Sequence, residues 1–189
     1  MKPQTDAEII ATVLDGNKNS YGLLVDAYSG RIINYLARMA GNRYDAEELA
    51  QEAFVRAYYA LPSYNPAYKF STWLYKIATN LCLSHLKKAQ RLVCVGDYQG
   101  EDGDGEWELP DPNARCSPPM VLELHELQRE IQEAINQLPP SFRSIVVLRH
   151  VHELSYQEIA DVTDLPIGTV KSRLGRGRSR LAELLEGRI

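Results

Sequence analysis

The chain has 189 residues, a net charge of −4, and 44% hydrophobic and 24% charged residues, a composition typical of a globular protein and too apolar for a disordered one. Its start, MKPQTDAEII, lacks the apolar segment of a signal peptide, and no apolar run reaches the roughly 18 residues that cross a bilayer. Its three cysteines, Cys82, Cys94 and Cys116, form no CxxC pair, which argues against a disulfide framework or a four-thiolate zinc site. We therefore expect a cytoplasmic protein without membrane insertion.

Charge is distributed unevenly along the chain. Residues 1–91 hold 11 basic and 8 acidic residues, residues 92–118 hold 1 and 7, and residues 119–189 hold 9 and 10. The middle block also contains four Gly and three Pro without helical or strand periodicity, a composition typical of a linker. Its EDGDGE run does not fit the calcium-loop pattern. The sequence predicts an all-α protein with two small helical domains, 1–91 and 119–189, joined by a flexible acidic linker over 92–118.

Helical signals run through the first domain. Thr5 and Glu8 fit the S/T-x-x-E capping box and predict a helix to about Asp15, and Asp45 can cap a later helix over 46–61. Projected at 100° per residue, that later helix turns its alanines inward and leaves polar, aromatic and β-branched residues on the opposite face: Glu48, Gln51, Glu52, Val55, Tyr58 and Tyr59. An exposed valine flanked by tyrosines favours a docking surface for another protein. A solvated face with chance aromatics is the alternative.

Aromatic residues concentrate in the next segment. Seven of the sixteen Phe, Trp and Tyr residues fall between Tyr58 and Tyr75, where two prolines mark a loop and Ser71 can cap a helix to about Lys88. On this helix one stripe with helical spacing is formed by Trp73, Lys76, Asn80, Ser84 and Lys87. Lysines bind phosphates, rings stack on bases and an amide reads a base edge, so the segment favours single-stranded nucleic acid. The alternative is that Trp73 and its aromatic neighbours only fill the core.

The second domain predicts a helix-turn-helix. Ser155 and Glu158 form another capping box, and the short helix that they open is followed by a tight turn over 164–168 and a basic helix from about Thr169. The outward face of this last helix carries small and basic side chains suited to a major groove: Lys171, Ser172, Gly175, Arg176, Arg178 and Ser179. We interpret Gly175 and Gly177 as places where the backbone approaches DNA closely. A solvated basic helix is the alternative.

Three stretches in order resemble a known family. DAEELAQEAFVRAYYAL, KFSTWLYKIATNL and LPPSFRSIVVLRHVHELSYQEIADVTDLPIGTVKSRLGRGR are similar to bacterial sigma factors of the extracytoplasmic-function (ECF) class. The resemblance covers nearly the whole chain and places a variable linker where the family has one. It implies a protein that is not an enzyme, binds core RNA polymerase and directs it to promoters. Residues 1–91 would be sigma region 2 and residues 119–189 sigma region 4.

The resemblance also implies which residues meet each partner. The polymerase would be bound by Glu48, Gln51, Glu52, Val55 and Tyr59. The −10 element would be melted and held by Tyr64, Tyr68, Lys69, Phe70, Ser71, Trp73, Lys76, Asn80 and Lys87. The −35 duplex would be read by Thr169, Lys171, Ser172, Arg173, Arg176 and Arg178. An anti-sigma factor is a further implied partner, and no catalytic residue, metal or other cofactor is implied.

Two other classes of protein are alternatives. A conventional helix-turn-helix regulator would bind its operator tightly without polymerase, usually as a dimer on paired half-sites. The aromatic and basic segment 64–88 argues against it, because a duplex reader does not need residues that stack on single strands. An enzyme acting on nucleic acid would need a metal cluster or an acid–base constellation, and the acidic residues of the predicted helices are spread as surface charge.

Overall fold

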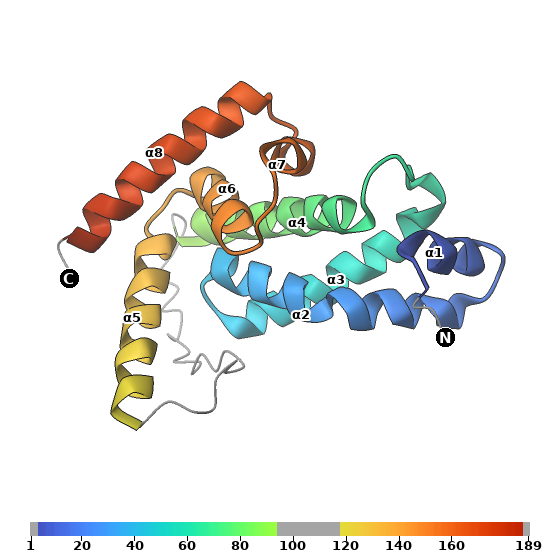
Figure 1. The fold of residues 1–189 in the computed structure, drawn as a ribbon, viewed down its shortest axis with the longest axis horizontal. Coiled ribbons are helices and arrows are strands. Elements are labelled where there is room, and N and C mark those ends of the chain that lie inside the picture. Colours follow the sequence, from blue (N-terminus) through green and yellow to red (C-terminus); the bar gives the residue numbers. More distant parts are fainter. Residues whose placement is uncertain (1–3, 94–117, 187–189) are drawn as a thin grey trace.

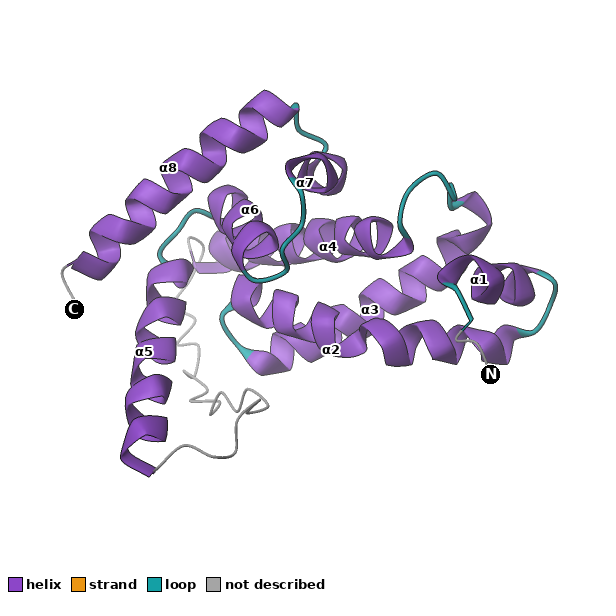
Figure 2. Ribbon diagram, viewed as in Figure 1, coloured by secondary structure: helices purple, strands orange, loops and turns teal. Residues whose placement is uncertain are grey.

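The computed structural model describes residues 4–93 and 118–186, and all of the regular structure in these ranges is helical (Figure 2). The helices are α1 Asp6–Leu14, α2 Tyr21–Ala40, α3 Arg43–Ala60, α4 Phe70–Val93, α5 Pro118–Asn136, α6 Pro140–His150, α7 Tyr156–Thr163 and α8 Ile167–Glu186, with short 3-10 turns at Lys18–Ser20 and Leu61–Ser63. The all-α prediction is confirmed. In the described ranges no helix is both long and apolar enough to cross a bilayer.

Helices α1 to α4 form the first packed unit, with α2 and α3 side by side and α4 packed against both (Figure 1). The predicted capping box begins α1, since the Thr5 hydroxyl accepts from the backbone N–H of Glu8 and the Glu8 carboxylate accepts from the N–H of Thr5. Helix α2 ends at Gly41, whose φ of +87° is the left-handed conformation that favours glycine at a helix end.

Two predicted helix starts in this unit need correction. The cap of α3 is Asn42, whose side-chain oxygen accepts from the backbone N–H of Asp45 at 2.8 Å, so the helix begins three residues before 46. Helix α4 begins at Phe70 and continues to Val93, because the N–H of Trp73 already donates to the carbonyl of Lys69. Ser71 therefore lies inside the first turn and is not the cap.

Helices α6, α7 and α8 carry the predicted helix-turn-helix. Ser155 and Glu158 form the predicted capping box of α7, which ends at Asp164 in the left-handed conformation with a φ of +54°. Helix α8 begins at Ile167, two residues before the predicted start. The buried face of these helices includes Ile159 and Val170. Because the turn is only a few residues long, α7 and α8 are held at a fixed angle to each other (Figure 1).

The two helical units lie against each other. Helices α6 and α7 pack on α2 and α4, and α5 crosses the end of α2 (Figure 1). The sequence predicted a flexible linker between the two units and gave no indication of this contact. Residues 94–117, which hold most of that linker with Cys94 and Cys116, lie outside the described residues. Cys82 is buried in α4, and burial raises the pKa of its thiol to about 12.

Candidate polymerase and nucleic-acid interface

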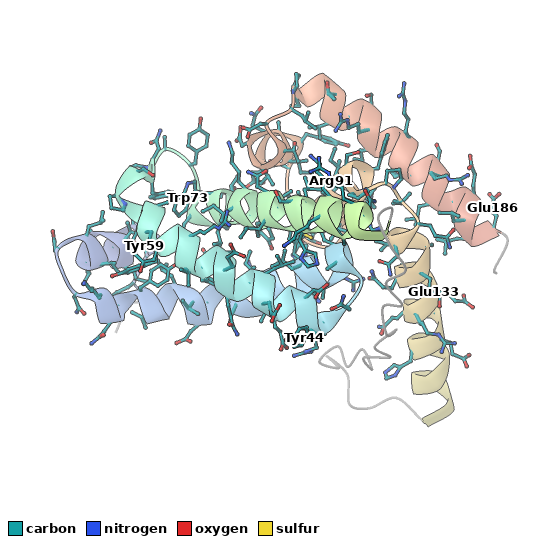
Figure 3. All side chains as sticks on the ribbon, turned by 180° about the vertical axis from the view of Figure 1, so that it is seen from behind. Tyr44, Tyr59, Trp73, Arg91, Glu133 and Glu186 are labelled. Carbon is teal, nitrogen blue, oxygen red and sulfur yellow. The ribbon has the colours of Figure 1, made fainter. Side chains whose placement is uncertain are left out.

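The outward face of α3 carries the residues predicted to bind another protein. Its inward face is buried and alanine-rich, which lets α3 pack closely on its neighbours. The outward face exposes every residue predicted for this role: Glu48, Gln51, Glu52, Val55 and Tyr59. Tyr59 is 78% exposed and Val55 54%, unusually high for large apolar side chains, and both line a groove between α2 and α3. Figure 3 shows Tyr59 and Tyr44 along this helix.

An aromatic cluster lies where the loop after α3 enters α4. The ring centroids of Tyr64 and Trp73 are 5.2 Å apart, and those of Phe70 and Trp73 are 5.8 Å apart. Phe70 is 1% exposed and Trp73 is half-buried, whereas Tyr68 is 50% exposed. Phe70 therefore supports the cluster from the core, while Tyr68 and the outer part of Trp73 face solvent. Core packing therefore applies to Phe70, while Tyr68 and part of Trp73 stay exposed, as a stacking surface would require.

The rest of the predicted stripe follows α4 away from this cluster. Asn80 and Lys87 are exposed, and Lys76 is half-buried because residues of the other helical unit lie over it. The opposite side of α4, which includes Leu74 and Ala78, is buried. One side of a single helix therefore presents aromatic, amide and basic groups in a row, which is the set of groups that a single nucleic-acid strand requires.

The two lysines nearest the aromatic cluster are paired with acids of the helix-turn-helix. Lys69 Nζ lies 2.8 Å from Glu158 Oε1, and Lys76 Nζ lies 2.6 Å from Asp164 Oδ1. The hydrogen bond from Lys69, together with hydrogen bonds from Ser155, lowers the pKa of Glu158 to about 2 against the opposing effect of burial. Since Glu158 caps α7 and Asp164 ends it, both ends of α7 are attached to the face of α4.

The basic face of α8 is turned away from α4. Its predicted DNA-binding residues Lys171, Ser172, Arg176 and Arg178 are exposed, and Thr169 and Arg173 are half-buried. Lys171 and Arg149 both lie over the ring of Tyr156, at 5.8 and 5.2 Å from its centroid, a cation–π arrangement that holds the two cations at the start of α7.

The two glycines of α8 have different surroundings. A Cβ at Gly175 would meet no atom within 4 Å, so its backbone is open to a partner. A Cβ at Gly177 would lie 2.8 Å from Val146 Cγ2, on the side that packs against α6. Our interpretation of Gly177 as a position of DNA approach is therefore wrong, because the close packing of α6 and α8 requires this glycine.

Two polar residues that no sequence pattern indicated join the units: Arg143, which is buried, and His152, which is half-buried. Arg143 of α6 donates to the carbonyls of Met39, Asn136 and Leu138, so its guanidinium bridges the end of α2 and the end of α5. The Nδ1 of His152 lies 2.8 Å from the hydroxyl of Tyr75. Both residues lie in the third stretch that resembles the family, but only tertiary contacts give them these partners.

Each of the two helical units matches a known protein family. The family model described as Sigma-70 region 2 matches residues 24–92, and that described as Sigma-70, region 4 matches residues 128–181. The chain is 37% identical over 177 residues to the ECF RNA polymerase sigma factor SigW of Bacillus subtilis, covering 93% of this chain and 94% of that protein. It is 33% identical over 186 residues to the RNA polymerase sigma-H factor of Pseudomonas aeruginosa, covering 97% and 95%.

The chain belongs to the ECF sigma factors of RNA polymerase. The fold agrees: the chain superposes on CnrH, solved in complex with the cytosolic domain of CnrY, with a TM-score of 0.68 at 23% identity, covering 96% of this chain and 97% of that one. The sigma factor RpoE of Bartonella quintana, solved with the anti-sigma factor NepR, gives a TM-score of 0.66 at 23% identity, covering 89% and 98%. As an ECF sigma factor the protein directs transcription initiation, and the conventional regulator is not favoured.

Proposed function

We propose that this sigma factor uses three separate surfaces, on α3, α4 and α8, to bind core RNA polymerase, the −10 strand and the −35 duplex. The observation that carries the proposal is the row of aromatic, amide and basic side chains along one side of α4. The exposed face of α3, with Val55 and Tyr59, is a separate surface. It acts by binding and not by catalysis, and we place this action in the cytoplasm, where the polymerase is.

The α3 surface suits a protein partner. Interface energy concentrates in a few large side chains that become fully desolvated, with tyrosine among the commonest. Tyr59 and Val55 provide such side chains in the groove, Gln51 lines it with a polar group, and Glu52 is exposed on the same helix. We propose that the polymerase buries this surface and holds the sigma factor through it.

The α4 surface suits a melted strand. Unstacking a base costs a few kcal/mol, and stacking returns about 1–3 kcal/mol per base. Tyr68 and Trp73 offer ring surface for stacking, Lys69 and Lys76 are spaced to bind phosphates, and Asn80 is exposed for a base edge. Phe70 and Ser71 then act by holding the loop and the first turn of α4 in place, since Phe70 is buried and Ser71 is half-buried.

The α8 surface suits duplex DNA. Lys171, Arg173, Arg176 and Arg178 place four cations on the exposed part of the second helix of a helix-turn-helix. Gly175 leaves the backbone between them open. An anti-sigma factor is a further proposed partner, because RpoE of Bartonella quintana was solved with the anti-sigma factor NepR.

Run-off transcription with core polymerase on a promoter library tests the assignment. We expect promoter-specific transcripts only when the sigma factor is present. Asn80→Ala should abolish strand opening measured by permanganate reactivity, while Ser84→Ala, on the same helix, should retain it. Arg176→Ala should weaken −35 protection by about tenfold, from a loss of 1–3 kcal/mol, while Arg180→Ala should not.

Three outcomes would contradict the proposal. Tight duplex binding by the isolated protein without any gain from polymerase would support a conventional regulator. Equal opening of the promoter strands by the Asn80 and Ser84 variants would contradict the −10 role of this face of α4. Equal −35 protection by the Arg176 and Arg180 variants would remove the role of α8.

A further inference from the structure

We propose that the free sigma factor holds itself closed, with α7 of its own helix-turn-helix seated on the −10 face of α4, so that α7 must leave before a melted strand can bind. The inference rests on the proposed −10 role of that face. The new element is that α7 of this same chain competes with the −10 strand for that face of α4.

Two ion pairs carry the inference. Glu158 and Asp164 lie at the two ends of α7, and each binds one of the lysines proposed to hold DNA phosphates. The pairs join residues 88 and 89 positions apart in sequence, so they come from packing of the two units and not from local structure. A carboxylate and a phosphate oxygen satisfy the same ammonium group, so the acids of α7 and the DNA strand compete for the same contacts.

Contacts other than the ion pairs also hold α7 and the neighbouring α6 against the first helical unit. The ring of His152, in the loop before α7, lies between Tyr35 and Tyr75, with centroid distances of 5.6 and 5.3 Å. Arg143 donates to the carbonyl of Met39 at the end of α2. The buried apolar residues of the two units also form one continuous cluster, so these polar and aromatic contacts add to an apolar interface. The interface therefore defines one closed arrangement, and the two ion pairs are the part of it that lies on the proposed −10 face.

The closed arrangement engages only one of the three proposed surfaces, the one on α4, by pairing its two lysines, while Tyr68 and Asn80 stay exposed. Val55 and Tyr59 on α3 stay exposed, and so do Lys171 and Arg176 on α8. Polymerase and the −35 duplex can therefore reach the closed protein, whereas a melted strand meets Lys69 and Lys76 with their ammonium groups already paired with acids of α7. The structure thereby gives an order of events: docking comes first, and engagement of the −10 strand follows release of α7.

The test removes the two acidic charges while keeping the local structure. Glu158→Gln preserves the capping box, which accepts Gln as well as Glu, and Asp164→Asn preserves the left-handed helix end, which Asn tolerates. The control is Asp161→Asn, on the same helix, whose carboxylate accepts only from Gln157 among the hydrogen bonds of the described residues. Small-angle X-ray scattering of the free protein measures opening. Fluorescence anisotropy measures binding of a labelled single-stranded oligonucleotide carrying the −10 region of a promoter active in the run-off assay.

We expect the E158Q/D164N variant to show a larger radius of gyration than the wild type and to bind the strand about three- to thirtyfold more tightly, the range that two surface ion pairs allow. D161N should match the wild type in scattering and bind with less than a twofold change. The inference is overturned if E158Q/D164N stays as compact as D161N, or if it opens without binding the strand more tightly than D161N.

Failure of the proposed −10 role gives a different result. Lys76→Ala, introduced into E158Q/D164N, should lose the gain in strand binding, and Lys87→Glu in holoenzyme should weaken promoter opening. If neither change affects strand binding or permanganate reactivity, the −10 assignment of α4 fails, while the scattering result still reports whether the acids of α7 hold the protein closed.

Discussion

Protonation of His152 should destabilise the closed arrangement. Burial, reinforced by the positive charges of Arg38 and Arg31, lowers the pKa of His152 to about 4. Its Nδ1 contacts the Tyr75 hydroxyl, and within the described part of the chain its buried Nε2 has no hydrogen-bond partner. A second proton would therefore place a charge in a site that offers it no acceptor and already faces two cations.

The sign and size of the effect follow from proton linkage. Because the folded pKa lies below the ordinary value of 6.5, the neutral imidazole contributes stability that is fully present above pH 6.5 and is lost as the pH falls from 6.5 towards 4. Between pH 7.5 and pH 5 this single site should remove about 2 kcal/mol from the free energy of unfolding, or roughly a thirtyfold change in the equilibrium constant.

Urea denaturation followed by circular dichroism at pH 7.5, 6.5 and 5.0 measures this loss. His152→Gln keeps a neutral polar group beside Tyr75 and removes the titration, so the variant should lose about 2 kcal/mol less than the wild type over this range. His125→Gln, in the exposed part of α5, should follow the wild type. Identical pH dependence of the wild type and His152→Gln would refute the reasoning, as would a pKa above 6 for His152 measured by NMR.

Other predictions concern packing and buried groups. Gly177→Ala should destabilise the protein by about 1–3 kcal/mol through overpacking, whereas Gly175→Ala, with open space around it, should stabilise it by up to about 1 kcal/mol; thermal denaturation compares the two. Arg143→Ala should cost about 3 kcal/mol, because it leaves buried carbonyls unpaired, whereas Arg180→Ala at an exposed ion pair should cost less than about 0.5 kcal/mol in urea titrations. Cys82 should resist N-ethylmaleimide until the protein is denatured, as mass spectrometry of the labelled peptide would show.

Features set by neighbouring residues could be predicted from the sequence. The capping boxes at Thr5 and Ser155 were predicted because each needs only two side chains three positions apart. The outward face of α3 was predicted because a burial pattern repeats every 3.6 residues. The start of α3 was misplaced because Asn42 and Asp45 are both good caps, and the choice between them depends on where the chain leaves Gly41.

Contacts between residues far apart in the sequence leave no local sequence pattern that predicts them. Asp164 and Lys76 are ordinary surface residues in their own helices, and nothing in either segment indicates that they meet. Gly177 was misinterpreted for the same reason, because its requirement comes from Val146 on another helix. Sequence periodicity therefore predicted which side of each helix is buried within its own unit. The structure was needed to show which surfaces of the two units meet.

The weakness of the contacts over the −10 face is what allows the closed arrangement to act as a gate. A strand that binds only the open form has its apparent dissociation constant raised by the reciprocal of the open fraction. Surface ion pairs such as Lys76–Asp164 contribute little individually, so removing them changes the open fraction only by a modest factor. A partner that binds the open form about a hundredfold more tightly, a difference of about 2.7 kcal/mol, would convert a mostly closed protein into a mostly open one. Contacts at the α3 surface do not supply that difference, because this surface is exposed in the closed form as well; it must come from contacts that only the open form makes, such as those of a bound strand with Lys69 and Lys76.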